Sequence, residues 1–261
     1  MKRFFVAALA AACMVVGSAN VSLASVDLLF SYTGDAQERG YGFGDTVAIY
    51  NNAAGTATTD VQLFAYNYDL GSLTTLASMD AGGDLSGDEF INNRYRQGPY
   101  AYLDSKSGGR LAGLGVGQVL TSSFQVDPSN DDNTSGFGND GNGNFTRGEV
   151  SAFSLASAGG ITDFLFRDAD HFLLTSGKIA VSFNSGSSWT TYDVGADSKL
   201  VGFDGAFVGA NQKVALAYVD TQFYLDTAVF DSNFSVVPEP STMLVWGGLF
   251  GLGLVGRRRR S

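Results

Sequence analysis

A strand pattern is clearest at Val61-Gln62-Leu63-Phe64-Ala65-Tyr66-Asn67-Tyr68. Successive side chains of a β-strand point to opposite faces, so this stretch presents two sets of side chains. The two sets are Val61, Leu63 and Ala65 on one face, and Phe64, Tyr66 and Tyr68 on the other. Because both sets contain bulky apolar groups, neither face suits contact with water. The pattern predicts a central strand that is covered on both sides in a two-layer packing.

Short strand-like segments separated by turn residues occur on both sides of this stretch. They are residues 26–30 and 46–50 before it, and residues 150–155, 161–167, 172–174, 179–183, 189–194, 200–203, 214–219 and 223–230 after it. A spacing of about 8–12 residues is typical of antiparallel sandwiches. Helical segments are too few to connect parallel strands. The sequence therefore predicts an all-β fold, an antiparallel β-sandwich. Residues 222–230 resemble the final strand of carbohydrate-binding jelly rolls, which favours a jelly-roll-like topology.

The first 24 residues have the features of a secretory signal peptide. Lys2 and Arg3 precede an apolar stretch at residues 4–16, and residues 22–24, Ser-Leu-Ala, fit the small-x-small pattern before a cleavage site. We therefore expect a signal helix at residues 1–24 that signal peptidase removes.

The single cysteine, Cys13, lies inside this signal. It is a poor lipidation site, because Ala10 stands where a lipoprotein signal usually carries Leu. Residues 17–19 offer a second cleavage site besides the one after Ala24. Cleavage after Ala24 leaves a body without cysteine, which excludes a disulfide scaffold, thiolate zinc sites and cysteine nucleophiles.

The C-terminus carries three features in a fixed order: Val237-Pro238-Glu239-Pro240-Ser241, an uncharged and mostly apolar run at residues 242–256, and a basic cluster. The cluster consists of Arg257, Arg258, Arg259 and Arg260. A spanning helix needs about 20 apolar residues, but flanking residues add length and arginine side chains can reach the headgroups. Basic flanks resist translocation, so the arginines act as a membrane stop on the cytoplasmic side. The run predicts a transmembrane helix that leaves the body outside.

This order of features resembles the PEP-CTERM sorting signal of Gram-negative bacteria, with Pro238, Glu239 and Pro240 as the sorting motif. The resemblance covers residues 236–261. It implies that an exosortase recognises the motif and processes the tail during delivery to the cell surface, after a transient stay in the inner membrane. The alternative is a plain single-span anchor behind a proline-stiffened linker.

The body between the two signals, residues 25–235, is strongly acidic. Without the basic residues of the two ends, 10 of the 16 Lys and Arg remain, and 25 of the 26 Asp and Glu remain, so the body carries a net charge of −15. Such a surface repels nucleic acid and anionic membranes, and we expect no nucleic-acid partner. A possible seam between subdomains lies at residues 127–145, where apolar side chains are too few to offset the entropy of ordering.

The same region holds the best candidate metal site. Asp140, Asn142 and Asn144 place oxygen atoms at alternate positions, as a calcium-binding loop does, and Glu149 could supply a further carboxylate. The EF-hand pattern fails, because Phe145 stands at the sixth position, where Gly is needed. The alternative is a solvated acidic loop without metal.

The remaining motifs are better explained by local structure than by a chemical function. His171 follows Asp170, but the chain contains no Gly-x-Ser-x-Gly elbow, and one histidine cannot form the usual zinc site. We expect a turn histidine without a catalytic role. Residues 182–189 resemble an Asp-box with Asn184 in place of Asp; a single imperfect copy predicts an ordinary hairpin. A further set of aromatic residues could stack on sugars or pack in the core: Tyr41, Tyr95, Tyr100, Tyr102 and Trp189.

The function that the sequence favours is a non-enzymatic protein of the bacterial surface or extracellular matrix, associated with biofilm and exopolysaccharide. The first alternative is a calcium-assisted carbohydrate-binding module, and extracellular polysaccharide would then be its partner. A glycoside hydrolase is less favoured, because no stretch singles out a carboxyl group with a raised pKa.

Overall fold

The structure is a computed structural model that describes residues 26–32, 39–52, 54–81, 98–104, 112–119, 133–137 and 140–231. These residues form an all-β fold with antiparallel pairing throughout, which confirms the predicted fold class at this level. The strands are β1 (Val26–Leu29), β2 (Arg39–Tyr41), β3 (Thr46–Tyr50), β4 (Thr58–Asp69), β5 (Asp80–Ala81), β6 (Gly98–Asp104), β7 (Gly113–Val119), β8 (Gly136–Phe137), β9 (Arg147–Leu155), β10 (Gly159–Arg167), β11 (Lys178–Ser182), β12 (Thr190–Asp193), β13 (Ala206–Val208), β14 (Lys213–Tyr218) and β15 (Tyr224–Asp231). Two short 3-10 helices, η1 (Phe30–Tyr32) and η2 (Leu76–Ser78), complete the described elements.

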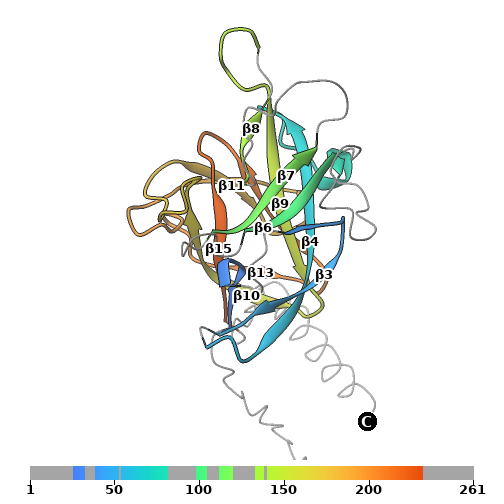
Figure 1. Cartoon of the computed structure of the whole chain (residues 1–261), viewed down its shortest axis with the longest axis vertical. Coiled ribbons are helices and arrows are strands. Elements are labelled where there is room, and N and C mark those ends of the chain that lie inside the picture. The colour runs from blue at the N-terminus through green and yellow to red at the C-terminus, as the bar shows by residue number, and fades with distance from the viewer. Residues whose placement is uncertain are drawn as a thin grey trace, which may run out of the picture.

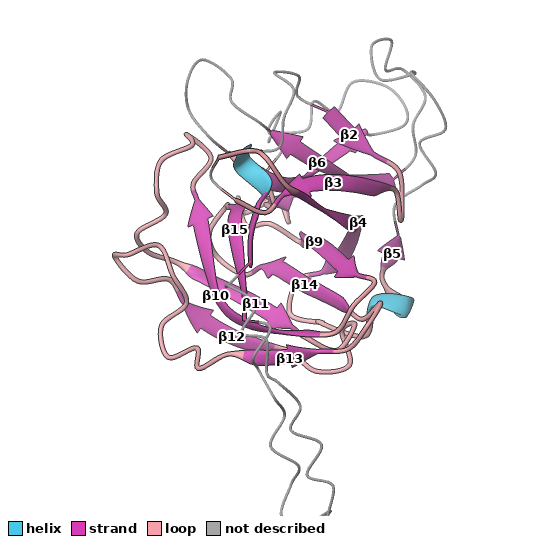
Figure 2. Cartoon of the chain, turned by 90° about the horizontal axis from the view of Figure 1, so that it is seen from below, coloured by secondary structure: helices cyan, strands magenta, loops and turns pink. Residues whose placement is uncertain are grey.

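The strands belong to one continuous sheet that folds over on itself. Its order is β12-β11-β14-β9-β4-β3-β1-β15-β7-β6-β2, with β10 on the other side of β15 and β13 beside β10. Strand β1 joins the two layers, because it is hydrogen-bonded to β3 on one side and to β15 on the other. Figures 1 and 2 show the curvature, which places β10 and β15 across the interior from β9 and β14.

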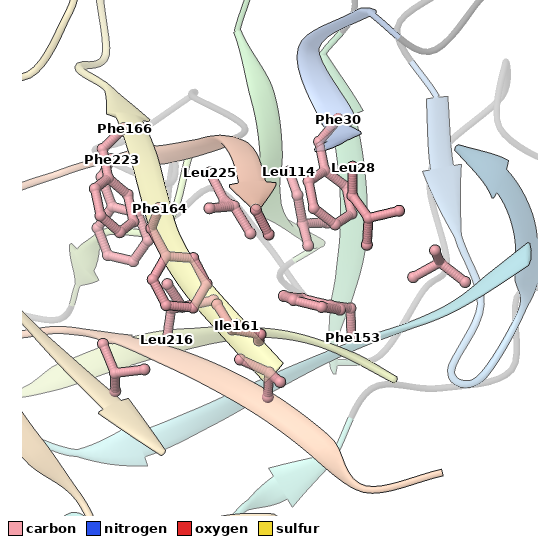
Figure 3. Packing of buried hydrophobic residues seen from close by; sticks show 14 of the residues in the cluster. Leu28, Phe30, Leu114, Phe153, Ile161, Phe164, Phe166, Leu216, Phe223 and Leu225 are labelled. Atoms are coloured by element: carbon pink, nitrogen blue, oxygen red, sulfur yellow. The ribbon is translucent and has the colours of Figure 1, made fainter. Parts of the chain in front are cut away.

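The main core fills the space between these layers (Figure 3). The ring of Phe30 packs against that of Phe153 with centroids 5.3 Å apart, and Phe166 meets Phe223 edge-on at 5.6 Å. All four side chains are fully buried. Because these residues come from η1, β9, β10 and the position just before β15, their packing holds distant parts of the chain together.

Strand β4 is central, as predicted. It pairs with β3 on one side and with β9 on the other. Val61 and Leu63 lie in the main core, whereas Phe64, Tyr66 and Tyr68 lie in a second core on the opposite face. Small residues of β9, β11 and β14 face this second core: Ala152, Ala180, Ala215 and Ala217. The segment that follows β4 covers it with Leu70, Leu73, Leu76 and Met79.

The hairpin predicted at residues 182–189 is confirmed, because it connects the paired strands β11 and β12. The side chain of Asn184 shapes the turn by accepting a hydrogen bond from the backbone N–H of Ser188 at 2.9 Å. The indole N–H of Trp189 donates to the carbonyl oxygen of Thr74 at 2.9 Å and fastens the segment that carries η2. Trp189 therefore packs against the second core.

Two predicted strands were wrong in extent. Residues 172–174 and 200–203 contribute only single bridges, from Leu173 to Arg167 and from Leu200 to Val194. His171 and Ser198, which precede these bridges, have φ values of 66° each, and a left-handed residue turns the chain out of an extended strand.

The predicted signal helix and the predicted transmembrane segment at residues 242–256 lie outside the described residues. Within the described part of the chain, neither 3-10 helix is long and apolar enough to span a bilayer.

Candidate functional site

The sorting residues Pro238, Glu239 and Pro240, and the arginines Arg257 to Arg260, lie outside the described residues. The structure does describe the strand that leads to them. Strand β15 ends at Asp231, seven positions before Pro238. It is held on one side by β10 and on the other by β1 and β7. The tail is therefore attached to one of the most firmly paired strands of the body.

The first and last described strands are direct neighbours. Val26 of β1 lies opposite Phe230 of β15, and the pairing continues to Leu29 opposite Thr227. Residue 26 is the second residue after the predicted cleavage site. Both ends of the described body consequently lie side by side at one end of the same strand pair.

The predicted calcium loop is a compact turn around Asp140. The carboxylate of Asp140 accepts hydrogen bonds from the backbone N–H of Asn142 at 2.7 Å and from the side-chain amide of Asn144 at 2.9 Å. Gly141 and Gly143 have φ values of 85° and 90°, which suit glycine. These hydrogen bonds, from the Asn144 side chain first and then from the Asn142 backbone, lower the pKa of Asp140 to about 2.

The carboxylate of Glu149, on β9, is buried and takes part in a different contact. Its Oε2 atom accepts hydrogen bonds from the backbone N–H of Ser135 at 2.7 Å and from the Ser135 hydroxyl at 3.1 Å. The structure thus brings Asp140, Asn142 and Asn144 together and gives Glu149 another role. In the described ranges, no group of three or more His, Cys, Asp or Glu side chains could hold a metal ion. Calcium binding stays a prediction.

The contact with Glu149 explains how part of the region 127–145 is ordered. Thr134 pairs with Phe223 through both backbone hydrogen bonds, and its hydroxyl donates to Ser151 at 3.0 Å. Residues 133–135 are fully buried. Polar contacts with β9 and with Phe223, just before β15, replace the missing apolar side chains.

The titration of Asp140 tests this geometry. We expect its carboxyl to titrate near pH 2 by NMR, and we expect Asn144→Ala to return its pKa towards the ordinary value of 3.8. A lowered pKa means that the carboxylate stabilises the turn above about pH 4, and that this contribution is lost as the pH falls through about 2. An unchanged pKa in Asn144→Ala would contradict the bonding described here.

Phe145, which follows this turn, lines a pocket of about 370 Å³. Phe145 is 39% exposed, and its ring meets the ring of the buried Tyr218 edge-on, with centroids 6.1 Å apart. Asp168, Asp170, Asp220 and Gln222 form much of the remaining lining. None of the described lining residues is basic. The pocket combines an aromatic wall with three carboxylates.

The pocket is shaped by a glycine on β8. A Cβ atom added to Gly136 would lie 2.6 Å from the ring of Phe145 and 2.6 Å from that of Tyr218. Real Cβ atoms do not approach other atoms this closely, so a larger residue would displace both rings. Burial raises the pKa of Tyr218, and the charge of Asp220 adds to this effect.

Two of the carboxylates each use one oxygen to hold the backbone. Oδ1 of Asp168 accepts from the N–H groups of Asp170 and Phe172 at 3.0 and 2.9 Å, and Oδ1 of Asp220 accepts from the N–H of Lys178 at 2.6 Å. The side chain of Asp168 is therefore held by its own loop, and that of Asp220 by the start of β11.

A second polar cluster is buried near one end of β15, and sequence reasoning missed it. Asp226 accepts a hydrogen bond from Nε of Arg167 at 2.8 Å and another from the hydroxyl of Ser31. Arg167 also donates to the carbonyl oxygen of His171 at 3.1 Å. Nε2 of His171 lies 2.9 Å from Oδ2 of Asp104. His171 is in a turn, as predicted, and its ring also packs edge-on against Tyr224.

The aromatic residues that could stack on sugars or pack in the core do not all lie at one site. Tyr100 and Tyr102 are neighbours on β6 with ring centroids 6.2 Å apart, whereas Trp189 packs against the second core. Tyr95 lies outside the described residues.

Comparison with known proteins bears on the tail alone. The family model of the PEP-CTERM protein-sorting motif matches residues 236–260, which include Pro238, Glu239 and Pro240. The tail is a PEP-CTERM sorting motif. No curated protein and no solved structure matches the chain. The PEP-CTERM motif implies secretion, exosortase-dependent sorting to the bacterial envelope, and exosortase as the processing partner.

Proposed function

We propose that the chain is a non-enzymatic protein of the outer surface or extracellular matrix of a Gram-negative bacterium, where it associates with biofilm exopolysaccharide. In this proposal, signal peptidase removes residues 1–24 and an exosortase processes the tail at Pro238, Glu239 and Pro240. Residues 242–256 anchor the chain in the inner membrane until then. The observation that carries the proposal is the PEP-CTERM match at residues 236–260.

The fold is compatible with this route. Strands β1 and β15 are paired, so the two chain ends that would contact the membrane leave the body next to each other. The acidic body can then stay on the outer side while both ends are processed, since a net charge of −15 is repelled by anionic headgroups.

Deletion of residues 238–240 in the producing bacterium tests the sorting step. We expect the deletion variant to accumulate in the membrane fraction with its tail attached, because the exosortase lacks its recognition motif. Ser241→Ala, next to the motif, is the matched control and should be processed normally. Surface display and removal of the tail in the deletion variant, at the level of the control, would contradict the proposal.

A second candidate function, carbohydrate binding, is favoured by the pocket at Phe145. Its exposed aromatic ring and its carboxylates are the groups that bind the apolar face and the hydroxyls of a sugar. The turn at Asp140 directly precedes Phe145, so calcium bound there would assist the same site. Thermal unfolding of the full chain with and without millimolar calcium tests the metal: a ligand that binds only the folded state raises the transition. An unmoved transition would remove calcium from the proposal.

A further inference from the structure

The composition of the Phe145 pocket indicates which class of sugar it would take, given the carbohydrate-binding function proposed above. Three carboxylates line it, and the described lining includes no Lys, Arg or His. Anionic polysaccharides would be repelled by this charge, and neutral ones would leave it uncompensated. A ligand that carries positive charge fits best.

The aromatic wall of the pocket narrows the class of ligand further. Phe145 is one of the few large apolar side chains that the described body exposes, and its ring meets the pocket. An exposed aromatic face attracts cations and also stacks on the apolar face of a pyranose ring. A volume of about 370 Å³ is at the small end of ligand sites, which suits one or two sugar rings.

Two of the lining carboxylates are fixed in position by backbone donors. The backbone N–H donors hold one oxygen of Asp168 and one oxygen of Asp220, and no described group donates to the second oxygen of either side chain. Asp170 adds a third carboxylate to the lining. Hydrogen bonds from an ammonium to carboxylates are among the strongest polar contacts, and positions fixed in advance lower the entropic cost of binding.

We propose that the pocket formed by Phe145, Tyr218, Asp168, Asp170 and Asp220 binds an amino sugar, with the pyranose against Phe145 and its ammonium group against the carboxylates. The ligand class is a polysaccharide or oligosaccharide that contains unacetylated amino groups. Calcium is not required for this contact, because the charge of the ligand itself pairs with the carboxylates.

Titration calorimetry with three probes tests the proposal on the full chain in a non-ionic detergent. The probes are a glucosamine tetramer, the N-acetylglucosamine tetramer and spermidine, which separate the charge from the ring. We expect the glucosamine tetramer to bind at least about tenfold more tightly than either other probe, because only it offers both charge-assisted hydrogen bonds and a stacking face. Its binding should weaken with added salt.

Three variants locate the binding. Phe145→Ala and Asp220→Asn should each weaken binding of the glucosamine tetramer about tenfold or more, through the lost ring and the lost charge. Asp60→Asn, an exposed carboxylate on β4, removes the same charge elsewhere and should leave binding unchanged. Unfolding temperatures of all three report whether the variants fold.

Each of the other possible results would overturn the amino-sugar proposal for a different reason. Equal binding of the acetylated tetramer would show a sugar site that does not recognise charge, and carbohydrate binding would survive. Equal binding of spermidine would show a cation site that does not recognise the ring. Binding that folded Phe145→Ala and Asp220→Asn retain would place the site elsewhere. No binding of any probe would remove carbohydrate binding as well, and would leave the sorting proposal untouched.

Discussion

Arg167→Ala is expected to lower the free energy of unfolding by about 3–5 kcal/mol, because it leaves the carboxylate of Asp226 buried without its cation. Asp226 is 3% exposed, and Nε of Arg167 lies 2.8 Å from its Oδ2 atom. The substitution also removes the donor to the carbonyl oxygen of His171, so the turn that carries the histidine loses a contact. Denaturant unfolding of the full chain measures the effect.

Lys199→Ala is the matched control for this prediction. Lys199 pairs with Asp163, but its side chain is 45% exposed, and such surface pairs contribute about 0–1 kcal/mol. Asp226→Asn combined with Arg167→Met removes both charges, and it should restore part of the lost stability, since no unpaired charge then remains. A loss in Arg167→Ala no larger than in Lys199→Ala would show that the buried pair does not hold β10 to β15.

Gly113→Ala is expected to lower the free energy of unfolding by about 2–6 kcal/mol, through the combined cost of overpacking and of backbone strain. Gly113 begins β7 with a φ of 141°, and an added Cβ would overlap the carbonyl oxygen of Leu225 on β15. Backbone atoms cannot move aside as a flexible side chain does, so β7 must shift away from β15. Thermal or denaturant unfolding provides the measurement.

Gly71→Ala is the control that separates backbone strain from overpacking. Gly71 also has a positive φ, 84°, but no atom lies within 4 Å of its added Cβ. The free energy of unfolding should fall only by the penalty of placing alanine in the left-handed region, about 1–2 kcal/mol. If the two variants lost the same stability, the close approach of β7 and β15 would not be needed for the fold.

The sequence predicted those strands whose apolar residues alternate clearly. Residues 61–68 fall within β4, and the segments at 150–155, 161–167, 179–183, 214–219 and 223–230 coincide with β9, β10, β11, β14 and β15 apart from their ends. The short strand β13 was missed, because three residues are too few to show an alternation. Pairing across the sheet, such as β1 with β15, joins residues about 200 positions apart and has no local signal.

The buried charges were predictable only in part. Asp226 stands in the apolar run Tyr224-Leu225-Asp226-Thr227-Ala228, and a carboxylate in a buried strand needs a partner. Nothing in the sequence names Arg167 as that partner, because the two residues meet only after β10 and β15 align. The same holds for Glu149, which looked like a possible metal ligand and is bonded to Ser135.

The sequence shows the kinds of residue that line the pocket, but it does not show that they form one site. Aromatic residues and carboxylates were both noted in the sequence, yet Phe145 was considered only for the turn position that it blocks. Its neighbour Asp168 follows β10, whereas Tyr218 ends β14 and Asp220 lies just after it. Only the fold brings these groups together, and Gly136 leaves room for the two rings.

The mature form of the protein in its own bacterium tests the central claim most directly. Mass spectrometry of both termini, together with cell fractionation, gives the location and the ends of the chain in one experiment. The account predicts a chain found outside the cell, beginning near residue 25 and lacking the apolar and arginine-rich tail. A full-length chain in the cytosol, with residues 1–24 and 242–260 still attached, would contradict it.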